Sequence, residues 1–176
     1  QLLKNAQKED ALATIFAYRV ADSKKYGVVE FDSTNNVIGL EEKPRNPRSD
    51  YAVTGLYFYD KFACEYAKSL KPSNRGELEI TDLNKIYLQQ NKLKVVLMPR
   101  GFAWLDTGTH HSLLEASNFI QVIESRQGIK IACLEEIAFY QKFISHEQLM
   151  QLANRYKNSG YGDYLKQISP QVQICE

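Results

Sequence analysis

The pattern of apolar and polar positions predicts strands through the first part of the chain. Residues 11–20 are apolar on both faces, as in an interior strand that helices cover. The polar segment before them, residues 1–10, carries a possible helical stripe at Leu2, Leu3 and Ala6. A helix that leads directly into a buried strand is typical of the middle of an α/β domain. We therefore expect the N-terminal part of this fold to be missing from the chain.

Further strands and helices follow, separated by turn residues. The predicted strands are residues 26–31, 37–43, 51–59, 93–98 and 102–105. Asp and Asn at residues 32–36 predict a turn between the first two of these strands. Helices are predicted to begin at the cap Asp60 and near Glu77, where acids suit the positive helix end. Thr109 is the predicted cap of a long amphipathic helix that ends near Ser125.

Beyond Gln127 the pattern changes from strands to short helices. The predicted helices are residues 134–144, 146–157 and 161–168. Ser145 and Gln148 have the spacing of a capping box at the start of the second one. The fold class is therefore α/β, with a mixed sheet and flanking helices in residues 1–126 and a helical appendage in residues 127–176.

Composition excludes several classes of protein. The chain has 176 residues, of which 44% are hydrophobic, enough for a real core. Its net charge is +1, from 22 basic and 21 acidic residues, so it offers no general basic field for nucleic acid. No apolar run could span a membrane, and the N-terminus has no signal-peptide pattern. Cys64, Cys133 and Cys175 lie far apart without metal-binding spacing, which indicates a reducing, cytoplasmic setting.

Two places in the sequence carry candidate chemistry. Glu42 and Lys43 stand side by side at the end of an apolar run, and Trp104 comes two residues before Asp106. A sugar phosphate needs groups of these kinds, because carboxylates accept from hydroxyls, an ammonium holds phosphate, and a further carboxylate can hold Mg²⁺. Gly55 marks a predicted strand position that a ligand or backbone can approach. A Glu–Lys pair is also common on solvated edges, so the residue types alone leave both interpretations open.

Other familiar catalytic patterns are absent from the sequence. It has no glycine-rich phosphate loop of the GxGxxG or Walker type and no nucleophile elbow. His110 and His111 are adjacent, so on a helix they point in different directions and cannot form a metal-binding pair. We expect these two histidines at the surface or in a helix cap, and His146 exposed near a helix start.

Five motifs follow one another in a recognisable order. They are YGVVEF at 26–31, LEEKP at 40–44, YAVTGLYFY at 51–59, RGELEITD at 75–82 and AWLDTGT at 103–109. The sequence here closely resembles the bacterial glucose-1-phosphate thymidylyltransferases, or dTDP-glucose pyrophosphorylases, of the sugar nucleotidyltransferase family. The resemblance continues through residues 115–120 and 135–139 and so covers nearly the whole chain. Related pyrophosphorylases share the Glu-Lys-Pro and Trp-x-Asp-x-Gly pieces, whereas ELEITD and ASNFI point to the thymidylyl branch.

The resemblance implies a Rossmann-like nucleotidyltransferase fold, Mg²⁺ dependence and a homotetramer. The implied reaction joins dTTP and glucose 1-phosphate to give dTDP-glucose and pyrophosphate, which leads to dTDP-rhamnose and cell-surface polysaccharide. Residues 1–126 become the sugar-binding part of the nucleotidyltransferase domain, and residues 127–176 an oligomerisation or regulatory appendage.

The resemblance also assigns roles to individual residues. Glu42 should accept from glucose hydroxyls, and Lys43 and Arg75 should hold the sugar-phosphate oxygens. Asp106 should be a Mg²⁺ ligand with Trp104 packed beside it. The residues expected to shape the sugar pocket are Tyr26, Gly27, Val53 and Tyr57.

The chain also departs from that family. The glycine-rich nucleotide loop, the base-reading region and a second Mg²⁺-binding aspartate are not in this sequence, so we expect the C-terminal part of the enzyme, inactive alone. Arg100 resembles part of a second nucleotide site that serves feedback inhibition, but Tyr140 stands where many relatives have Arg, which puts that control in doubt. Two alternatives stay open: a non-catalytic module for sugar-phosphate binding or oligomerisation, and a pyrophosphorylase with another nucleotide.

One helix also predicts self-association. In the long helix predicted after Thr109, one apolar stripe comprises Leu113, Ala116, Ile120 and Ile123. Three further apolar residues widen this stripe, namely Leu114, Phe119 and Val122. This apolar face is too broad for one sheet contact alone. We therefore expect part of it to meet another subunit in a symmetric interface.

Overall fold

The structure, a computed structural model, describes residues 2–7 and 11–168 of the chain. It divides into two compact units, residues 1–104 and residues 105–176. The boundary expected near residue 126 concerns functional parts and stays a prediction. Within the described residues, no helix is both long enough and apolar enough to cross a lipid bilayer.

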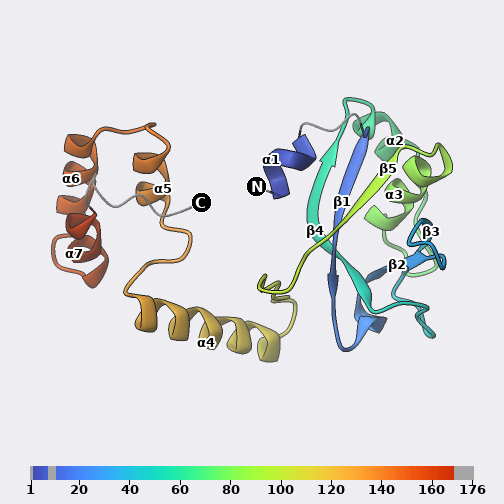
Figure 1. The fold of residues 1–176 in the computed structure, drawn as a ribbon, viewed down its shortest axis with the longest axis horizontal. Coiled ribbons are helices and arrows are strands. Elements are labelled where there is room, and N and C mark those ends of the chain that lie inside the picture. Colours follow the sequence, from blue (N-terminus) through green and yellow to red (C-terminus); the bar gives the residue numbers. More distant parts are fainter. Residues whose placement is uncertain (1, 8–10, 169–176) are drawn as a thin grey trace. The chain divides into compact units, whose positions relative to one another are not determined.

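The first unit is built on a mixed five-stranded sheet with the order β3-β2-β4-β1-β5 (Figure 1). The strands are β1 (Ala13–Arg19), β2 (Gly27–Phe31), β3 (Val37–Glu42), β4 (Tyr51–Tyr59) and β5 (Leu93–Leu97). β1 pairs with β4 in the antiparallel and with β5 in the parallel direction, and β2 is antiparallel to both β3 and β4. The predicted mixed α/β sheet is confirmed, and the predicted bounds of β4 agree with the structure.

The interior strand β1 is buried over its first five residues, as its two-sided apolar pattern predicts. One group of buried side chains, drawn from four strands, consists of Ile15, Ala17, Val29, Leu40 and Val53. A second group joins β1 to the helix behind the sheet and consists of Ala13, Leu83 and Tyr87. These contacts hold the sheet against α3 (Ile80–Gln89), which packs on β3 and β5.

The hairpin between β2 and β3 closes through the predicted Asp and Asn turn. The Asp32 carboxylate accepts from the backbone N–H groups of Thr34 and Asn36, each at 2.8 Å. Asn35 adopts a left-handed φ of 63°, which Asn tolerates well. This turn fixes the register that sets Gly27 opposite Glu42.

Gly55 lies where β4 carries extra residues relative to β1. The pairing passes from Ile15 with Tyr57 to Ala17 with Val53, so β4 bulges between these pairs. No described atom lies within 4 Å of the place where a Gly55 Cβ would stand. Within the described residues no backbone approaches this side of Gly55, so the glycine marks a bulge, and the expected ligand approach stays a prediction.

Two predicted helix starts are displaced by local hydrogen bonds. The predicted helix at Asp60 begins later, as α2 (Ala63–Ser69), because the Asp60 carboxylate closes a turn by accepting from the Phe62 N–H at 3.1 Å. The helix expected from Glu77 begins only at Ile80. Upstream of it, the Ser73 N–H donates to the Glu77 carbonyl at 2.8 Å, which keeps the segment in a loop.

The predicted strand at residues 102–105 is wrong. Residues 102–105 have no strand structure, and the parallel ladder ends with β5 at Leu97. Gly101, with a left-handed φ of 98°, turns the chain after that strand. Side chains hold the segment instead, since the Tyr18 hydroxyl donates to the Phe102 carbonyl at 3.1 Å.

The second unit is helical. Its helices are α4 (His110–Gln127), α5 (Leu134–Tyr140), α6 (His146–Arg155) and α7 (Gly160–Gln167). The predicted caps are confirmed, because Thr109 accepts from the Ser112 N–H at the start of α4 and Ser145 forms a capping box with Gln148. A buried group that joins α5, α6 and α7 consists of Cys133, Leu149, Ala153, Leu165 and Ile168.

Candidate functional site

The paired ends of β2 and β3 bring a glycine and a carboxylate together. Gly27 opens β2 and lies opposite Glu42, the last residue of β3. The Glu42 carboxylate accepts a short hydrogen bond from the Thr81 hydroxyl, which comes from the first turn of α3. A Cβ on Gly27 would stand 2.8 Å from the Thr81 hydroxyl oxygen and 3.1 Å from a Glu42 carboxylate oxygen. Glycine at this position therefore leaves the room in which the carboxylate is held.

Arg75 lies among three carboxylates in the loop before α3. Its Nη1 is 3.3 Å from Glu79 and 3.5 Å from Glu42, and its Nη2 is 2.8 Å from Glu77. Buried Glu79 also accepts from the Ser73 hydroxyl at 2.8 Å. The structure therefore brings the predicted residues Glu42 and Arg75 together, with the guanidinium already engaged by acids.

Lys43 follows directly in a strained backbone conformation. Its φ is 44°, in the left-handed region that a non-glycine residue rarely adopts, and Pro44 restricts it further. The Lys43 N–H donates to the Tyr26 carbonyl at 3.0 Å, which helps to hold this conformation. Its side chain is exposed, and no described carboxylate forms an ion pair with its ammonium. A lysine held in this way can present a compact positive charge to an anion.

Aromatic residues of β4 lie beside Glu42. Val53 is buried in the sheet core. Tyr57 is half-buried, and burial raises the pKa of its phenol, with the Glu42 charge as a second cause. The Tyr57 ring stacks on Tyr59 with centroids 5.7 Å apart, and the Tyr59 hydroxyl donates to the Asn84 side-chain oxygen at 2.6 Å. The Tyr57 side chain thus places an uncharged ring, fixed by its stacking on Tyr59, next to the Glu42 carboxylate.

A second aromatic group joins Trp104 to the start of β2. The Trp104 ring meets Tyr26 edge to face with centroids 5.1 Å apart, and Tyr18 at 6.0 Å. Because the Tyr26 carbonyl also holds Lys43, this cluster connects the tryptophan to the Glu42–Lys43 strand end. The predicted residues Tyr26 and Trp104 are therefore neighbours within the first unit.

The remaining predicted residues lie apart from this group in the chain. Arg100 is exposed in the turn after β5. Asp106 belongs to the second unit, is exposed, and its carboxylate would be 3.3 Å from a Cβ on Gly108. In the described part of the chain, no group of three or more His, Cys, Asp or Glu side chains is gathered for a metal. Mg²⁺ commonly takes one or two carboxylates and completes its shell with water and phosphate, so Asp106 fits as one ligand of such an ion.

Tyr140 at the end of α5 packs into the core of the second unit. Burial raises the pKa of its phenol, and the charge of Glu136 adds to this shift. Tyr140 is therefore a packing residue of this unit. The effect on feedback control stays a prediction.

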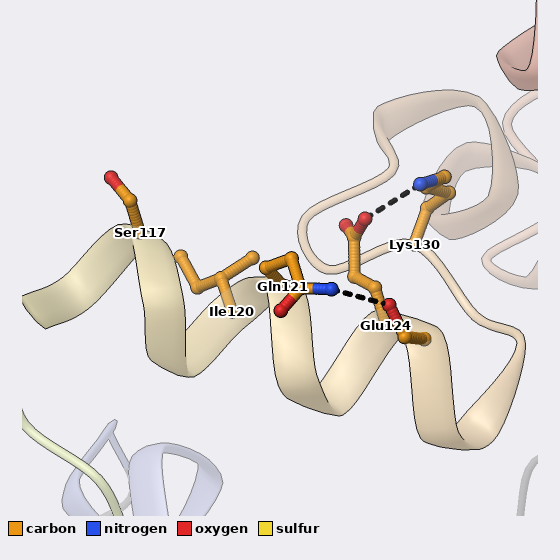
Figure 2. Close-up of a pocket in the computed structure, with 6 residues that line it drawn as sticks. Ser117, Ile120, Gln121, Glu124 and Lys130 are labelled. Atoms are coloured by element: carbon orange, nitrogen blue, oxygen red, sulfur yellow. Dashed lines mark hydrogen bonds and ion pairs between the residues drawn. The ribbon is translucent and has the colours of Figure 1, made fainter. Parts of the chain in front are cut away.

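Side chains that line a groove on the second unit form hydrogen bonds with one another (Figure 2). Lys130 donates to Glu124 at 2.6 Å, and Gln121 donates to Ser125 at 2.9 Å. The Lys130 hydrogen bond and the Ile131 N–H hold the pKa of Glu124 below its usual value. These side chains satisfy one another, and we assign no role to the groove.

Sequence reasoning missed the groups that hold the site. Thr81 restrains Glu42, Ser73 restrains Glu79, and Glu77 engages Arg75. The acids lie within a recognised motif, where the sequence alone predicts that they complement the helix dipole. Arg75 and Glu79 have the four-residue spacing of a helical ion pair, although here the pair forms in the loop before α3.

Comparisons with known proteins agree with one another. The sequence model of the family described as "Nucleotidyl transferase" matches residues 1–122. The chain is 53% identical to a glucose-1-phosphate thymidylyltransferase of Neisseria meningitidis over 94% of its length, and 55% identical to one of Xanthomonas campestris over 93%. It covers 57% and 55% of those relatives, so the chain spans about half the length of the curated relatives it matches.

A solved structure supports the same assignment. The crystal structure of a protein from Bacillus anthracis, assigned as a glucose-1-phosphate thymidylyltransferase and solved with sucrose, matches with a TM-score of 0.59 and 40% identity. The match covers 67% of this chain and 47% of that one. The predicted Rossmann-like nucleotidyltransferase fold is thereby confirmed.

Proposed function

Because the chain belongs to the nucleotidyl transferase family, we propose that it supplies the sugar-phosphate side of an enzyme that makes dTDP-glucose. The substrates of that enzyme are dTTP and glucose 1-phosphate, and pyrophosphate is the second product. The observation that carries the proposal is the Glu42 carboxylate, which lies opposite Gly27 and 3.5 Å from Arg75, with Lys43 next to it in the chain. These groups match the hydroxyls and the phosphate of one small ligand.

The reaction needs little covalent chemistry from the protein. An oxygen of the sugar phosphate attacks the α-phosphorus of dTTP, a new P–O bond forms, and the bond to pyrophosphate breaks. Catalysis of this kind rests on positioning and on neutralising charge. Glu42 orients the glucose by accepting from its hydroxyls, and Lys43 and Arg75 hold the attacking phosphate.

Other residues shape the pocket or neutralise charge. Tyr26, Val53 and Tyr57 form its wall, with Trp104 supporting Tyr26. Asp106 would hold Mg²⁺, which supplies positive charge to the phosphates when it is bound. Because the sequence has no glycine-rich phosphate loop, we propose that residues 1–176 alone do not turn over, and that the complete protein does.

The setting follows from the same proposal. We place the enzyme in the cytoplasm as a homotetramer, with its product used for dTDP-rhamnose and cell-surface polysaccharide. Arg100 belongs to a regulatory nucleotide site in this scheme, with Tyr140 weakening that control. A panel of nucleoside triphosphates tests the base, since preference for one other than dTTP would favour a different pyrophosphorylase.

Asp106→Asn in the complete protein tests the proposal directly. The change keeps the shape of the side chain and removes its charge, so kcat/KM for pyrophosphate release should fall on the order of a hundredfold. Asp163→Asn is the matched control, because Asp163 is an exposed aspartate in the same unit, 3.6 Å from Lys166. Full activity in Asp106→Asn would show that its assigned role is wrong. Absence of dTDP-glucose formation by the unaltered protein would reject the function.

A further inference from the structure

The three carboxylates around Arg75 are held with very different firmness. The side chains of Glu79 and Glu42 are only 9% and 19% exposed, whereas that of Glu77 is 61% exposed. The first two also accept from hydroxyl groups, Glu79 from Ser73 and Glu42 from Thr81. Among the residues that the structure describes, Arg75 is the one side-chain partner of Glu77. The two inner carboxylates, those of Glu79 and Glu42, are thus fixed, whereas the outer carboxylate of Glu77 is free to move.

We propose that Glu77 is an internal placeholder for the substrate phosphate. In the unliganded site its carboxylate occupies Nη2 of Arg75, and an arriving sugar phosphate displaces it. This inference rests on the proposed function, because it assigns a competitor to the same phosphate-binding arginine. Glu77 would therefore set how tightly the site binds sugar phosphate, without itself touching the sugar.

The cost of exchange decides which carboxylate leaves. Removing Glu79 or Glu42 from Arg75 would leave a largely buried charge short of a partner, which is expensive. Glu77 can return to water at almost no cost, because exposed ion pairs contribute little. A guanidinium carries five N–H donors, so Nη1 can stay on the inner acids while Nη2 turns to phosphate.

The local geometry favours this exchange. Arg75 and Glu77 are two residues apart in a loop, before the helix begins at Ile80. Gly76 between them has a left-handed φ of 78°, and a Cβ there would meet no described atom within 4 Å. The carboxylate can therefore move away without disturbing a packed element. Its departure also removes a negative charge that would repel the incoming phosphate.

Calorimetric titration of the complete protein with glucose 1-phosphate tests the placeholder. We expect Glu77→Gln to bind the sugar phosphate about two- to fivefold more tightly than the unaltered protein, as loss of an exposed competing ion pair predicts. Glu41→Gln is the matched control, because Glu41 is an exposed carboxylate next to Glu42 and removes the same charge. The gain from Glu77→Gln must exceed the gain from the control.

A second background separates competition for Arg75 from a general charge effect. In Arg75→Met, Glu77→Gln should change the affinity no more than Glu41→Gln does, since no guanidinium remains to compete for. An equal gain with and without Arg75, or no gain over the control, would overturn the placeholder and leave the proposed function intact. No binding of glucose 1-phosphate by the unaltered protein would instead reject the proposed function and this inference together.

Discussion

Gly27 lies directly opposite Glu42 across the β2–β3 ladder, and a Cβ on Gly27 would stand 3.1 Å from the Glu42 carboxylate. The same Cβ would stand 2.8 Å from the Thr81 hydroxyl oxygen that donates to this carboxylate. Because Gly27 has no side chain, the Glu42 carboxylate at the end of β3 has room to accept a hydrogen bond from Thr81 at the start of α3. The position of Glu42 depends on a residue that contributes no functional group.

Gly27→Ala should disturb this arrangement. The added methyl group forces Glu42 or Thr81 to move, which we expect to cost about 1–3 kcal/mol of stability and to weaken glucose 1-phosphate binding. Gly55→Ala is the matched control within the same sheet, because its Cβ would meet no described atom within 4 Å. Thermal melting and titration of both variants check the prediction. Equal behaviour of the two variants would contradict it.

Substitutions of Lys43 should separate its backbone strain from its charge. Lys43→Ala and Lys43→Gly both remove the ammonium, so each should lower kcat/KM of the complete protein on the order of a hundredfold or more. Only glycine adopts a φ of 44° without steric cost, so Lys43→Gly should be more stable than Lys43→Ala by about 1 kcal/mol. Melting temperatures in the opposite order would show that the left-handed backbone is not strained.

The contrast between β4 and the Arg75 loop shows how far sequence patterns reach. The strand Tyr51–Tyr59 and the caps at Thr109 and Ser145 follow from signals within a few residues, and the structure confirms them. The delayed start of α3 does not follow from such local signals, because a loop with its own hydrogen bonds competes with the helix. The network of Arg75 depends on Glu42, which is 33 residues away, so periodicity could not predict it.

Residues 102–105 show the same limit from the other direction. Their aromatic and apolar character predicts a strand, but a strand needs a partner with free backbone groups. The Trp104 ring instead packs on Tyr18 and Tyr26, and the Tyr18 hydroxyl donates a hydrogen bond to the Phe102 carbonyl. Tertiary contacts thus override a local preference, as is common for β propensity.

The Tyr164–Glu136 pair should make the helical unit sensitive to alkaline pH. The Tyr164 hydroxyl donates at 2.6 Å to the buried Glu136 carboxylate, and burial together with this bond raises the pKa of Tyr164 to about 12. An ordinary tyrosine ionises near pH 10, so the unfolded chain loses this proton first. The stabilisation is complete below about pH 10 and is lost as the pH rises towards 12.

Tyr164→Phe tests that pair. Leaving Glu136 without the hydroxyl should cost about 1–3 kcal/mol at neutral pH, and the melting temperature of the variant should fall less between pH 10 and 12. Tyr156→Phe is the control, since Tyr156 is exposed in the same unit. Melting curves across this range decide the matter, and a parallel loss in Tyr164→Phe and the unaltered chain would contradict the assignment.

The apolar face of α4 should drive self-association of the chain. Its exposed side chains are Leu113 at 50%, Leu114 at 59%, Phe119 at 42%, Ile120 at 38% and Val122 at 51%. Ala116, expected on the same stripe, is buried. Exposed apolar side chains gathered on one helix are commonly covered by a partner, and a second copy of the chain offers the same helix in a symmetric contact. Light scattering during size exclusion should therefore give a mass well above 20.2 kDa at micromolar concentration.

Leu114→Asn with Val122→Asn should lower that mass, because polar side chains do not gain from burial. Leu78→Asn, at an exposed leucine of the first unit, should leave it unchanged. A uniform 20.2 kDa species at every concentration would mean that α4 does not associate.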